Sequence, residues 1–167
     1  GMDIGLRAFA RLKEGWSGPV GLLIAGDGPQ RREIEELAKS LGVADAVNIL
    51  GWQEPEGVEA TILASDALVH AARFDPFPVA VLDAMRLGRA VLGSDVCGSV
   101  QARVRTGKNG VVFPSESVEA LTTIMRNVCE TPACLTLWGG AARRTAEEWP
   151  VSRGIETVYQ HAAQSIA

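Results

Sequence analysis

The 167-residue sequence has little of several features that mark particular classes of protein. It has only three cysteines and no CxxC pair, which argues against a disulfide framework or a thiolate metal site. Aromatic residues make up 5% of the chain, and no apolar run approaches the ~20 residues of a membrane-spanning helix. Basic residues are not in excess, since 16 Lys and Arg stand against 20 Asp and Glu. The net charge of −4 therefore argues against general binding to nucleic acid or anionic membranes.

Glycine is the residue that is over-represented. The chain has 18 glycines in 167 residues, about 11% against a usual ~7%. The remaining composition, 47% hydrophobic and 22% charged, is typical of one globular domain that can bury a core without a metal or a disulfide. The first 15 residues lack the pattern of a signal peptide, and the odd number of cysteines suits a reducing compartment. We therefore expect a cytoplasmic location.

Short apolar runs alternate with longer amphipathic segments along the chain. The apolar runs predict strands at residues 20–25, 47–50, 67–70, 90–93 and 110–113. The amphipathic segments predict helices at residues 2–12, 30–41, 56–64, 78–87, 117–129, 133–148 and 151–165. This alternation indicates an α/β fold with a Rossmann-like, doubly wound and mostly parallel sheet.

The loops that follow the strands are the candidate site, because ligands bind outside the carboxyl ends of the strands in such sheets. The first of these loops is a Gly-Asp-Gly-Pro turn at residues 26–29. Its glycines would let a ligand approach the backbone closely, although an ordinary tight strand-to-helix turn is the more frequent explanation of this motif. Residues 94–99 and 106–110 taken alone are interpreted as loops.

Residues 73–85 (RFDPFPVAVLDAM) carry two acids eight residues apart. Asp75 precedes a predicted helix whose first turn suits Pro78, and Asp83 lies in the middle of that otherwise apolar helix. Helix propensity gives no reason for an Asp at that position, so Asp83 is either a ligand group or a solvent-facing acid. Asp75 alone would be a helix cap. The side chains predicted to face the core are those of Val79, Leu82, Ala84 and Met85.

Five motifs follow one another in a specific order. They are Gly-Asp-Gly-Pro at 26–29, Leu-Gly at 50–51, the segment from 75 to 88, Ser-Asp-x-x-Gly at 94–98 and Thr-Gly-Lys-Asn-Gly at 106–110. In this order they resemble the C-terminal, nucleotide-sugar-binding half of a GT-B retaining glycosyltransferase of the group 1, family 4 type. The resemblance covers nearly the whole chain.

The resemblance implies a donor site for a UDP- or GDP-sugar at the carboxyl ends of the strands. In this donor site Asp75 would be the catalytic carboxylate that hydrogen-bonds hydroxyls of the transferred hexose. Asp83 would bind the ribose hydroxyls with its two acceptor oxygens. Backbone groups around Phe77, Pro78 and Val79 would cradle the diphosphate at a helix N-terminus. The remaining implied donor-binding residues lie near the base or on the floor of the cleft: Gly26, Gly28, Gly51, Trp52 and Gly98.

Some residues depart from the family pattern or have a simpler explanation. Asp75 and Asp83 stand where the family usually has Glu, which shortens their reach by about 1.5 Å. Cys97 replaces the first glycine of a Gly-Gly pair. Trp52 either stacks on the base or packs at the rim of the cleft, and His70 is interpreted as a packed histidine near the cleft.

The resemblance also implies that other parts of the enzyme lie outside these residues. In the family, a Gly-Arg-Leu strand and a Lys, whose basic groups bind the diphosphate, precede the helix at 2–12. That strand would be central in the sheet. Either the fragment is stabilised by a replacement or by association through the incomplete sheet, or the sequence is part of a longer protein. Residues 1–167 would form one donor-binding domain, and the N-terminal acceptor domain would be absent.

The intact enzyme would transfer a hexose to a hydroxyl of a glycan or lipid without a metal or other cofactor. Its missing half would make any peripheral contact with the inner face of the membrane, and the fragment alone would be inactive. Two alternatives remain open. One is a non-catalytic scaffold or regulatory module with this fold, and the other is a nucleotide-sugar 2-epimerase, which shares the GT-B fold.

Overall fold

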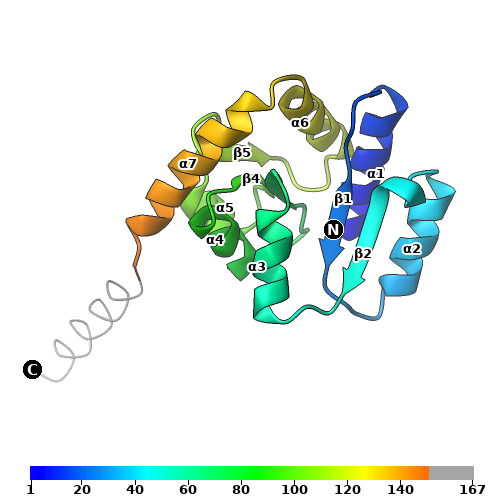
Figure 1. Ribbon diagram of the computed structural model, residues 1–167, viewed down its shortest axis with the longest axis horizontal. Helices are drawn as coiled ribbons and strands as arrows, with labels where there is room; N and C mark the ends of the chain where they lie inside the picture. Colours follow the sequence, from blue (N-terminus) through cyan, green and yellow to red (C-terminus); the bar gives the residue numbers. More distant parts are fainter. Residues whose placement is uncertain (151–167) are drawn as a thin grey trace, which may run out of the picture.

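Strands and helices alternate along residues 1–150, the part of the chain that the computed structural model describes (Figure 1). The strands are β1 (Leu22–Ala25), β2 (Val47–Gly51), β3 (Ala67–His70), β4 (Ala90–Ser94) and β5 (Gly110–Phe113). The helices are α1 (Met2–Glu14), α2 (Arg31–Ser40), α3 (Pro55–Leu63), α4 (Val79–Arg86), α5 (Gly98–Arg103), α6 (Val118–Glu130) and α7 (Ala133–Glu147), with a 3-10 turn at Ala44–Ala46. Every strand and helix predicted within residues 1–150 is present, whereas α5 and the 3-10 turn were not predicted. The predicted helix at 151–165 lies outside the described residues. None of the helices in residues 1–150 is long and apolar enough to span a membrane.

All the strand pairs are parallel, as the alternation of elements predicts, but the described strands form two sheets. β1 pairs with β2 in one sheet, and β3, β4 and β5 form the other in that order. β4 has a strand on each side, and all five of its residues are buried. A parallel strand that is covered on both faces needs an apolar sequence of this kind.

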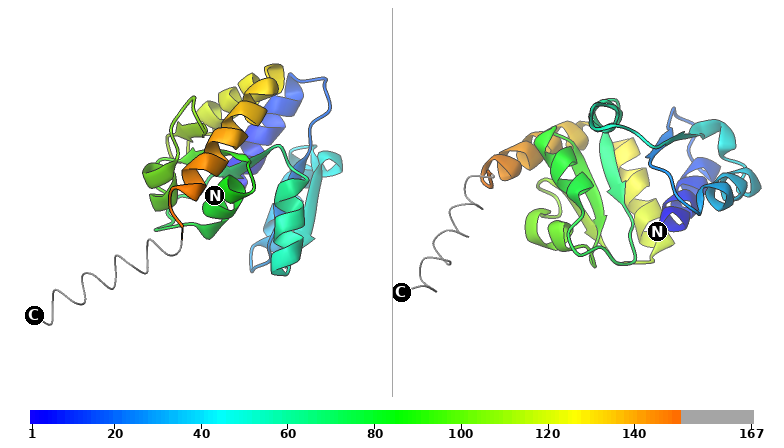
Figure 2. Two further views of the ribbon diagram at one scale, coloured as in Figure 1. Left: turned by 60° about the vertical axis from the view of Figure 1, so that its left-hand side comes forward. Right: turned by 90° about the horizontal axis from the view of Figure 1, so that it is seen from below.

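Helix α1 joins the two sheets. Leu6, Phe9 and Leu12 are at most 2% exposed and belong to one core with Ile24 of β1 and Phe113 of β5. α1 lies beside α6 in both views of Figure 2. Because β1 does not pair with β3 in the described chain, packing around α1 replaces hydrogen bonding as the link between the sheets.

A second core surrounds β4. It is formed by side chains of α4, α5 and α7, among them Met85, Val100 and Ala142. The prediction that Val79 faces this core is wrong, because its side chain is 65% exposed and Val81 is buried instead. Val79 is the first residue of α4 and lies at the end of the helix, beyond the packed layer.

An ion pair ties the start of α1 to the loop after β3. The Arg73 guanidinium donates to both carboxylate oxygens of Asp3 at 2.7 Å and to Oε1 of Glu116 at 2.9 Å. These hydrogen bonds from Arg73 lower the pKa of the Asp3 carboxyl from its usual 3.8 to about 2. The folded state therefore favours the charged form of Asp3.

Truncating a core side chain of α1 tests whether its packing holds the two sheets together. We expect Phe9→Ala to lower the free energy of unfolding by about 3–5 kcal/mol, because it removes a buried ring and leaves a cavity between the sheets. Urea denaturation followed by circular dichroism measures this. Leu137→Ala removes a side chain that is 72% exposed and should change stability by less than ~0.5 kcal/mol. Equal losses in the two variants would contradict the proposed role of α1.

The Asp3–Arg73 pair predicts a pH dependence of stability. The pKa of Asp3 is lower in the folded than in the unfolded chain, so its contribution is present above pH 4 and is lost as the pH falls toward 2. Melting temperatures of the wild type and Asp3→Asn should thus differ at pH 5 and converge near pH 2. Asp45→Asn, at an exposed carboxylate on the 3-10 turn, is the control and should show no such convergence.

Candidate functional site

The predicted site loops lie at the carboxyl ends of the strands, where α1 also begins. Gly1 packs so closely against Ala71, the residue after β3, that a Cβ at Gly1 would overlap the Ala71 carbonyl group. A groove of about 530 Å³ lies between the first half of α1 and one face of α2, and Arg73 after β3 also lines it. The loops that follow strands of the two sheets therefore open at the same end of the molecule.

One cluster of predicted residues lies at the ends of β1 and β2. The Gly26 N–H donates to the Gly51 carbonyl oxygen at 2.8 Å, and the φ angles of these residues are +130° and +72°. Such angles favour glycine, so the hydrogen-bonded contact between the ends of β1 and β2 requires glycine at both positions. Gly28 is exposed in the following turn.

Trp52 is 74% exposed, so the prediction that it packs at the rim is wrong. Its ring is accessible to a ligand or another protein.

The second cluster lies on the loops after β3 and β4, which are joined by hydrogen bonds. The Gly98 N–H donates to the Asp75 carbonyl oxygen at 3.1 Å, the Ser99 hydroxyl to the Pro78 carbonyl at 3.0 Å, and the Ser94 hydroxyl to the Ala72 carbonyl at 2.7 Å. A Cβ at Gly98 would overlap the carbonyl oxygen of the loop that carries Asp75. Gly98 is thus needed for the contact between the loops.

Ser94 and Ser99 are site-forming residues that sequence reasoning missed. Both side chains are fully buried, and their hydroxyls hold the loop that carries Asp75. A buried hydroxyl needs a partner, which is why each donates to a carbonyl of the neighbouring loop. The signal available in the sequence was a serine at each end of the short Ser94–Ser99 segment, directly after an apolar strand.

The Asp75 carboxylate is held between a backbone amide and a histidine. Its Oδ1 accepts a hydrogen bond from the Phe77 N–H at 3.2 Å, and its Oδ2 lies 3.4 Å from Nε2 of His70. His70 is half-buried at the end of β3, as predicted for a packed histidine near the cleft. Burial lowers the pKa of its imidazole, so His70 is neutral at pH 7. His70 therefore lies beside the Asp75 carboxylate without supplying a positive charge to it.

Helix α4 begins directly after this loop and carries the second acid. Of the three residues predicted to cradle a diphosphate, Phe77 already donates its N–H to Asp75, and Pro78 has no N–H. Val79, the first residue of α4, is left with an amide at the positive end of the helix. Asp83 lies one turn further on, with its side chain 39% exposed and Oδ1 4.0 Å from Nε of Arg86.

The two arginines next to these loops are already paired with acids. Arg31 contacts Asp27 and Glu35, each at 3.0 Å, and Arg73 contacts Asp3 and Glu116. The described loops thus present carboxylates and backbone amides to a ligand, while the charges of these two arginines are balanced. Sequence reasoning also missed the exposure of Phe74, which is 78% exposed beside Asp75.

Comparison with known proteins agrees with this architecture. The family described as "Glycosyl transferases group 1" matches residues 1–145. A D-inositol 3-phosphate glycosyltransferase from Gordonia bronchialis is 30% identical over 158 residues, which cover 89% of this chain and 34% of that protein. The chain thus spans about a third of the length of this curated relative.

Two solved structures have the same fold at lower sequence identity. Sucrose-phosphate synthase from Thermosynechococcus elongatus has a TM-score of 0.85 at 22% identity, over 99% of this chain and 43% of its own. Anabaena Alr3699/HepE, solved in complex with UDP-glucose, has a TM-score of 0.79 at 21% identity, over 97% of this chain and 44% of its own. With its Rossmann-like fold and a family match over most of its length, this chain belongs to the group 1 glycosyl transferases, which have the GT-B fold.

Proposed function

We propose that this chain is the donor-binding, C-terminal half of a retaining two-domain glycosyltransferase. The intact enzyme transfers a hexose from a UDP- or GDP-sugar to a hydroxyl of a glycan or lipid. The observation that carries this proposal is the arrangement of Asp75, the start of α4 and Asp83 at the carboxyl end of the sheet. The UDP-glucose complex of Anabaena HepE, a protein of the same fold, supports a nucleotide sugar as the ligand.

Asp75 is proposed as the catalytic residue, whose carboxylate contacts the transferred sugar. Hydrogen bonds from Ser94, Gly98 and Ser99 fix its loop, and the Phe77 amide orients its carboxylate. A fixed carboxylate accepts hydrogen bonds from sugar hydroxyls with little loss of side-chain entropy. Because burial lowers the pKa of His70, a cationic imidazole does not compete with the sugar for the Asp75 carboxylate.

The nucleotide is proposed to lie along the first turns of α4. The Val79 amide and the helix dipole favour the negative charge that grows on the diphosphate as its bond to the sugar breaks. Asp83 lies four residues later, about 6 Å further along the helix axis, and accepts hydrogen bonds from the ribose hydroxyls. Gly26, Gly28, Gly51 and Trp52 would flank the base, and the Gly98 contact keeps the loops together.

The remaining parts of the reaction are assigned to the rest of the enzyme. Arg31 and Arg73 are paired with acids, so the cations that stabilise the leaving diphosphate are proposed to come from outside the described residues. The acceptor site and any contact with the inner face of the membrane are proposed to belong to the N-terminal half. The reaction is proposed to need no metal, the fragment alone to be inactive, and the enzyme to be cytoplasmic.

Nucleotide titration tests this function on the chain itself. We expect UDP or GDP to bind weakly, with a dissociation constant on the order of 0.1–1 mM, because backbone amides and Asp83 act without the missing cations. Isothermal calorimetry or nuclear magnetic resonance shifts of α4 amides would detect this. ATP is the control nucleotide and should bind at least ~10-fold more weakly. A folded protein that binds neither UDP nor GDP would contradict the proposal.

Replacing Asp83 tests the ribose contact. We expect Asp83→Ala to weaken binding of the preferred nucleotide by at least ~10-fold, the cost of losing hydrogen bonds to a charged group. Glu59→Ala is the matched control, because Glu59 also lies near Arg86, at 3.7 Å, but is not proposed to contact the ligand. Equal effects of the two substitutions on nucleotide binding would mean that Asp83 acts only through the charge around Arg86. That result would contradict the proposed ribose contact. In the intact protein, loss of transfer by a folded Asp83→Ala variant would favour the enzyme, whereas an unchanged biological role of that variant would favour a non-catalytic module.

A further inference from the structure

His70, the last residue of β3, has a ring nitrogen that faces the Asp75 carboxylate. Nε2 of His70 is buried and has no hydrogen-bond partner of ordinary geometry in the described chain, while Oδ2 of Asp75 lies 3.4 Å from it. We propose that His70 is a positioning residue, whose Nε2–H holds the Asp75 carboxylate in place for hydroxyls of the transferred sugar. This role rests on the proposed function, because it concerns the carboxylate that is proposed to contact the sugar.

The strand determines on which face of the sheet the His70 ring lies. Side chains alternate between the two faces of a strand, so His70 points to the same face as Leu68, which packs against the core around β4. The residue that pairs with His70 on β4 is Gly93, where a Cβ would overlap Val100 of α5. Only 20% of the His70 side chain is exposed. A ring that is already packed in this way can hold a neighbouring group with little further loss of entropy.

The distance between Nε2 and the carboxylate indicates where the ring carries its proton. Burial lowers the pKa of the imidazole, so at pH 7 one ring nitrogen is a donor and the other is an acceptor. An unprotonated Nε2 would set its lone pair against the lone pairs of Oδ2, 3.4 Å away. The proton therefore belongs on Nε2. Hydrogen bonds of this length at a site without ligand often shorten when substrate binds.

Two segments of the chain hold the two oxygens of Asp75. Oδ1 accepts the Phe77 N–H at 3.2 Å, a contact with the second following residue that the short side chains of Asp and Asn make. A glutamate at this position would carry its carboxylate about 1.5 Å further from the backbone and would not keep both contacts. The Asp that departs from the family pattern thus fits the histidine beside it. Each oxygen has a second lone pair, so both can still accept a sugar hydroxyl.

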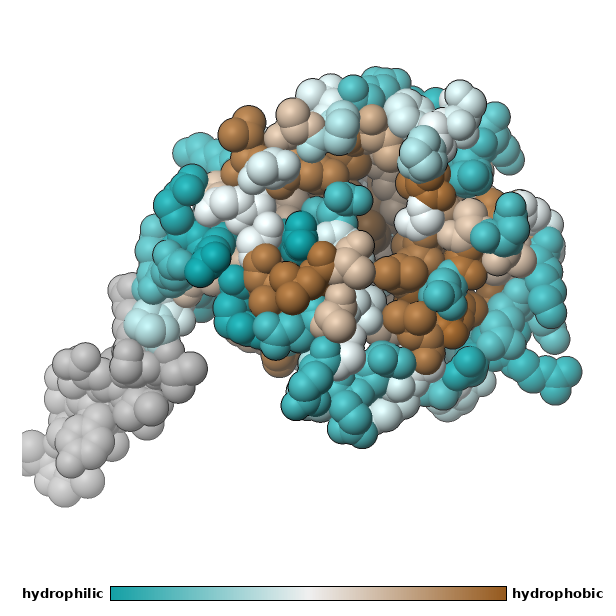
Figure 3. All heavy atoms as spheres, viewed as in Figure 1, coloured by the Kyte–Doolittle hydropathy of each residue, from teal (hydrophilic) through white to brown (hydrophobic). Residues whose placement is uncertain are grey.

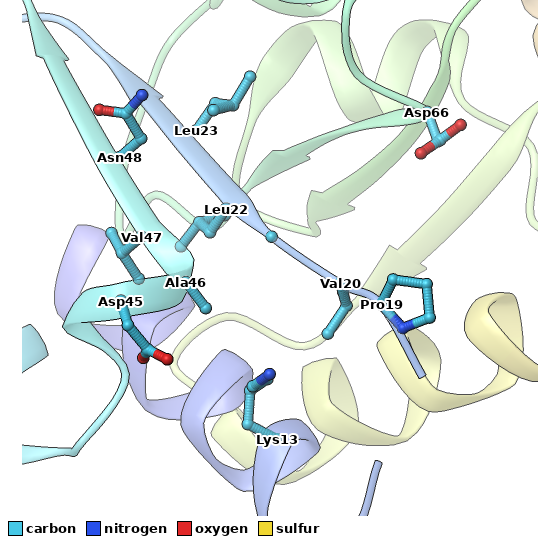
Figure 4. A pocket seen from close by; sticks show the side chains of 11 residues that line it. Lys13, Pro19, Val20, Leu22, Leu23, Asp45, Ala46, Val47, Asn48 and Asp66 are labelled. Atoms are coloured by element: carbon cyan, nitrogen blue, oxygen red, sulfur yellow. The ribbon is translucent and has the colours of Figure 1, made fainter. Parts of the chain in front are cut away.

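The opposite end of β3 provides a matched control. The surface is hollowed near the centre of the face drawn in Figure 3, with hydrophobic residues around the hollow. A cavity of about 850 Å³ lies at the amino ends of β1 and β2, and Asp66, directly before β3, lies across it from residues 19–23 (Figure 4). Asp66 is four residues before His70, about 13 Å away along the strand. The cavity lining includes this acid but no histidine, so Asp66→Asn changes an acid beside the same strand without touching the His70 contact.

A first experiment measures the contact without any ligand. Nitrogen chemical shifts distinguish the protonated from the unprotonated ring nitrogen, and His70 is identified by its absence from the His70→Gln spectrum, because the sequence has two histidines. We expect the proton of His70 on Nε2 at pH 7. Its exchange with water should be at least ~10-fold slower than in Asp75→Ala, which removes the acceptor. Asp66→Asn should keep the wild-type shifts and exchange rate.

A second experiment measures the effect on the sugar. The probes are UDP-glucose and GDP-mannose, each compared with its free nucleotide, so that the ratio of the two dissociation constants isolates the contribution of the sugar. His70→Phe keeps a ring but has no N–H, and it should weaken binding of the nucleotide sugar by about 3- to 10-fold without changing that of the nucleotide. His70→Gln places an amide N–H near the position of Nε2 and should restore most of this loss. Asp66→Asn should change neither constant.

The outcomes separate this inference from the proposed function. A folded wild-type chain that binds neither free nucleotide contradicts the proposed function, while the first experiment still decides whether His70 holds Asp75. Three results would overturn the role of His70 alone. They are a ring protonated on Nδ1, equal proton exchange in wild type and Asp75→Ala, and nucleotide binding with the same sugar contribution in wild type and His70→Phe. Equal losses in His70→Phe and His70→Gln would likewise reduce His70 to a packing role.

Discussion

The burial of helix α1 is the interaction on which the rest of the structure depends. Two parallel sheets that share no backbone hydrogen bond in residues 1–150 are held at a common core by Leu6, Phe9 and Leu12. Hydrophobic burial is not directional, so this packing sets the position of the sheets less strictly than a hydrogen-bonded ladder would. The Asp3–Arg73 pair adds direction, because it anchors the start of α1 at the end of the molecule where the site loops open.

The candidate site depends on close contacts between backbones as much as on its acids. Gly26 and Gly51 adopt angles that other residues avoid, and Gly98 allows the loop after β4 to touch the loop that carries Asp75. Buried serine hydroxyls then lock these two loops together. Three of the glycines, Gly26, Gly51 and Gly98, are thus explained by backbone angles and close backbone contacts that a Cβ would disturb.

The order and type of elements could be predicted from the sequence, because four- or five-residue apolar strands and amphipathic helices leave strong local patterns. The predicted ends of β3, β4 and β5 agree with the structure to within one residue. α5 was missed because six residues, Gly98–Arg103, are too few to show a helical period. The orientation of Val79 was wrong because helix periodicity says nothing about where the packed layer ends. For Trp52 the sequence left open whether the ring stacks on a base or packs at the rim, and the tertiary structure leaves the ring exposed.

The sequence by itself determined the α/β class, the family and the two acids flanking the start of α4, since these follow from local patterns and motif order. Only the tertiary structure decided that Arg73 forms an ion pair with Asp3, which is 70 residues away in the sequence. It also decided that His70 contacts Asp75 and that burial lowers the pKa of the His70 imidazole. The tertiary structure also decided that the five described strands form two sheets, β1 with β2 and β3 with β4 and β5. Pairing and burial are relations between segments that are distant along the chain, and a local pattern carries no information about which distant partner a charge or a strand edge will meet.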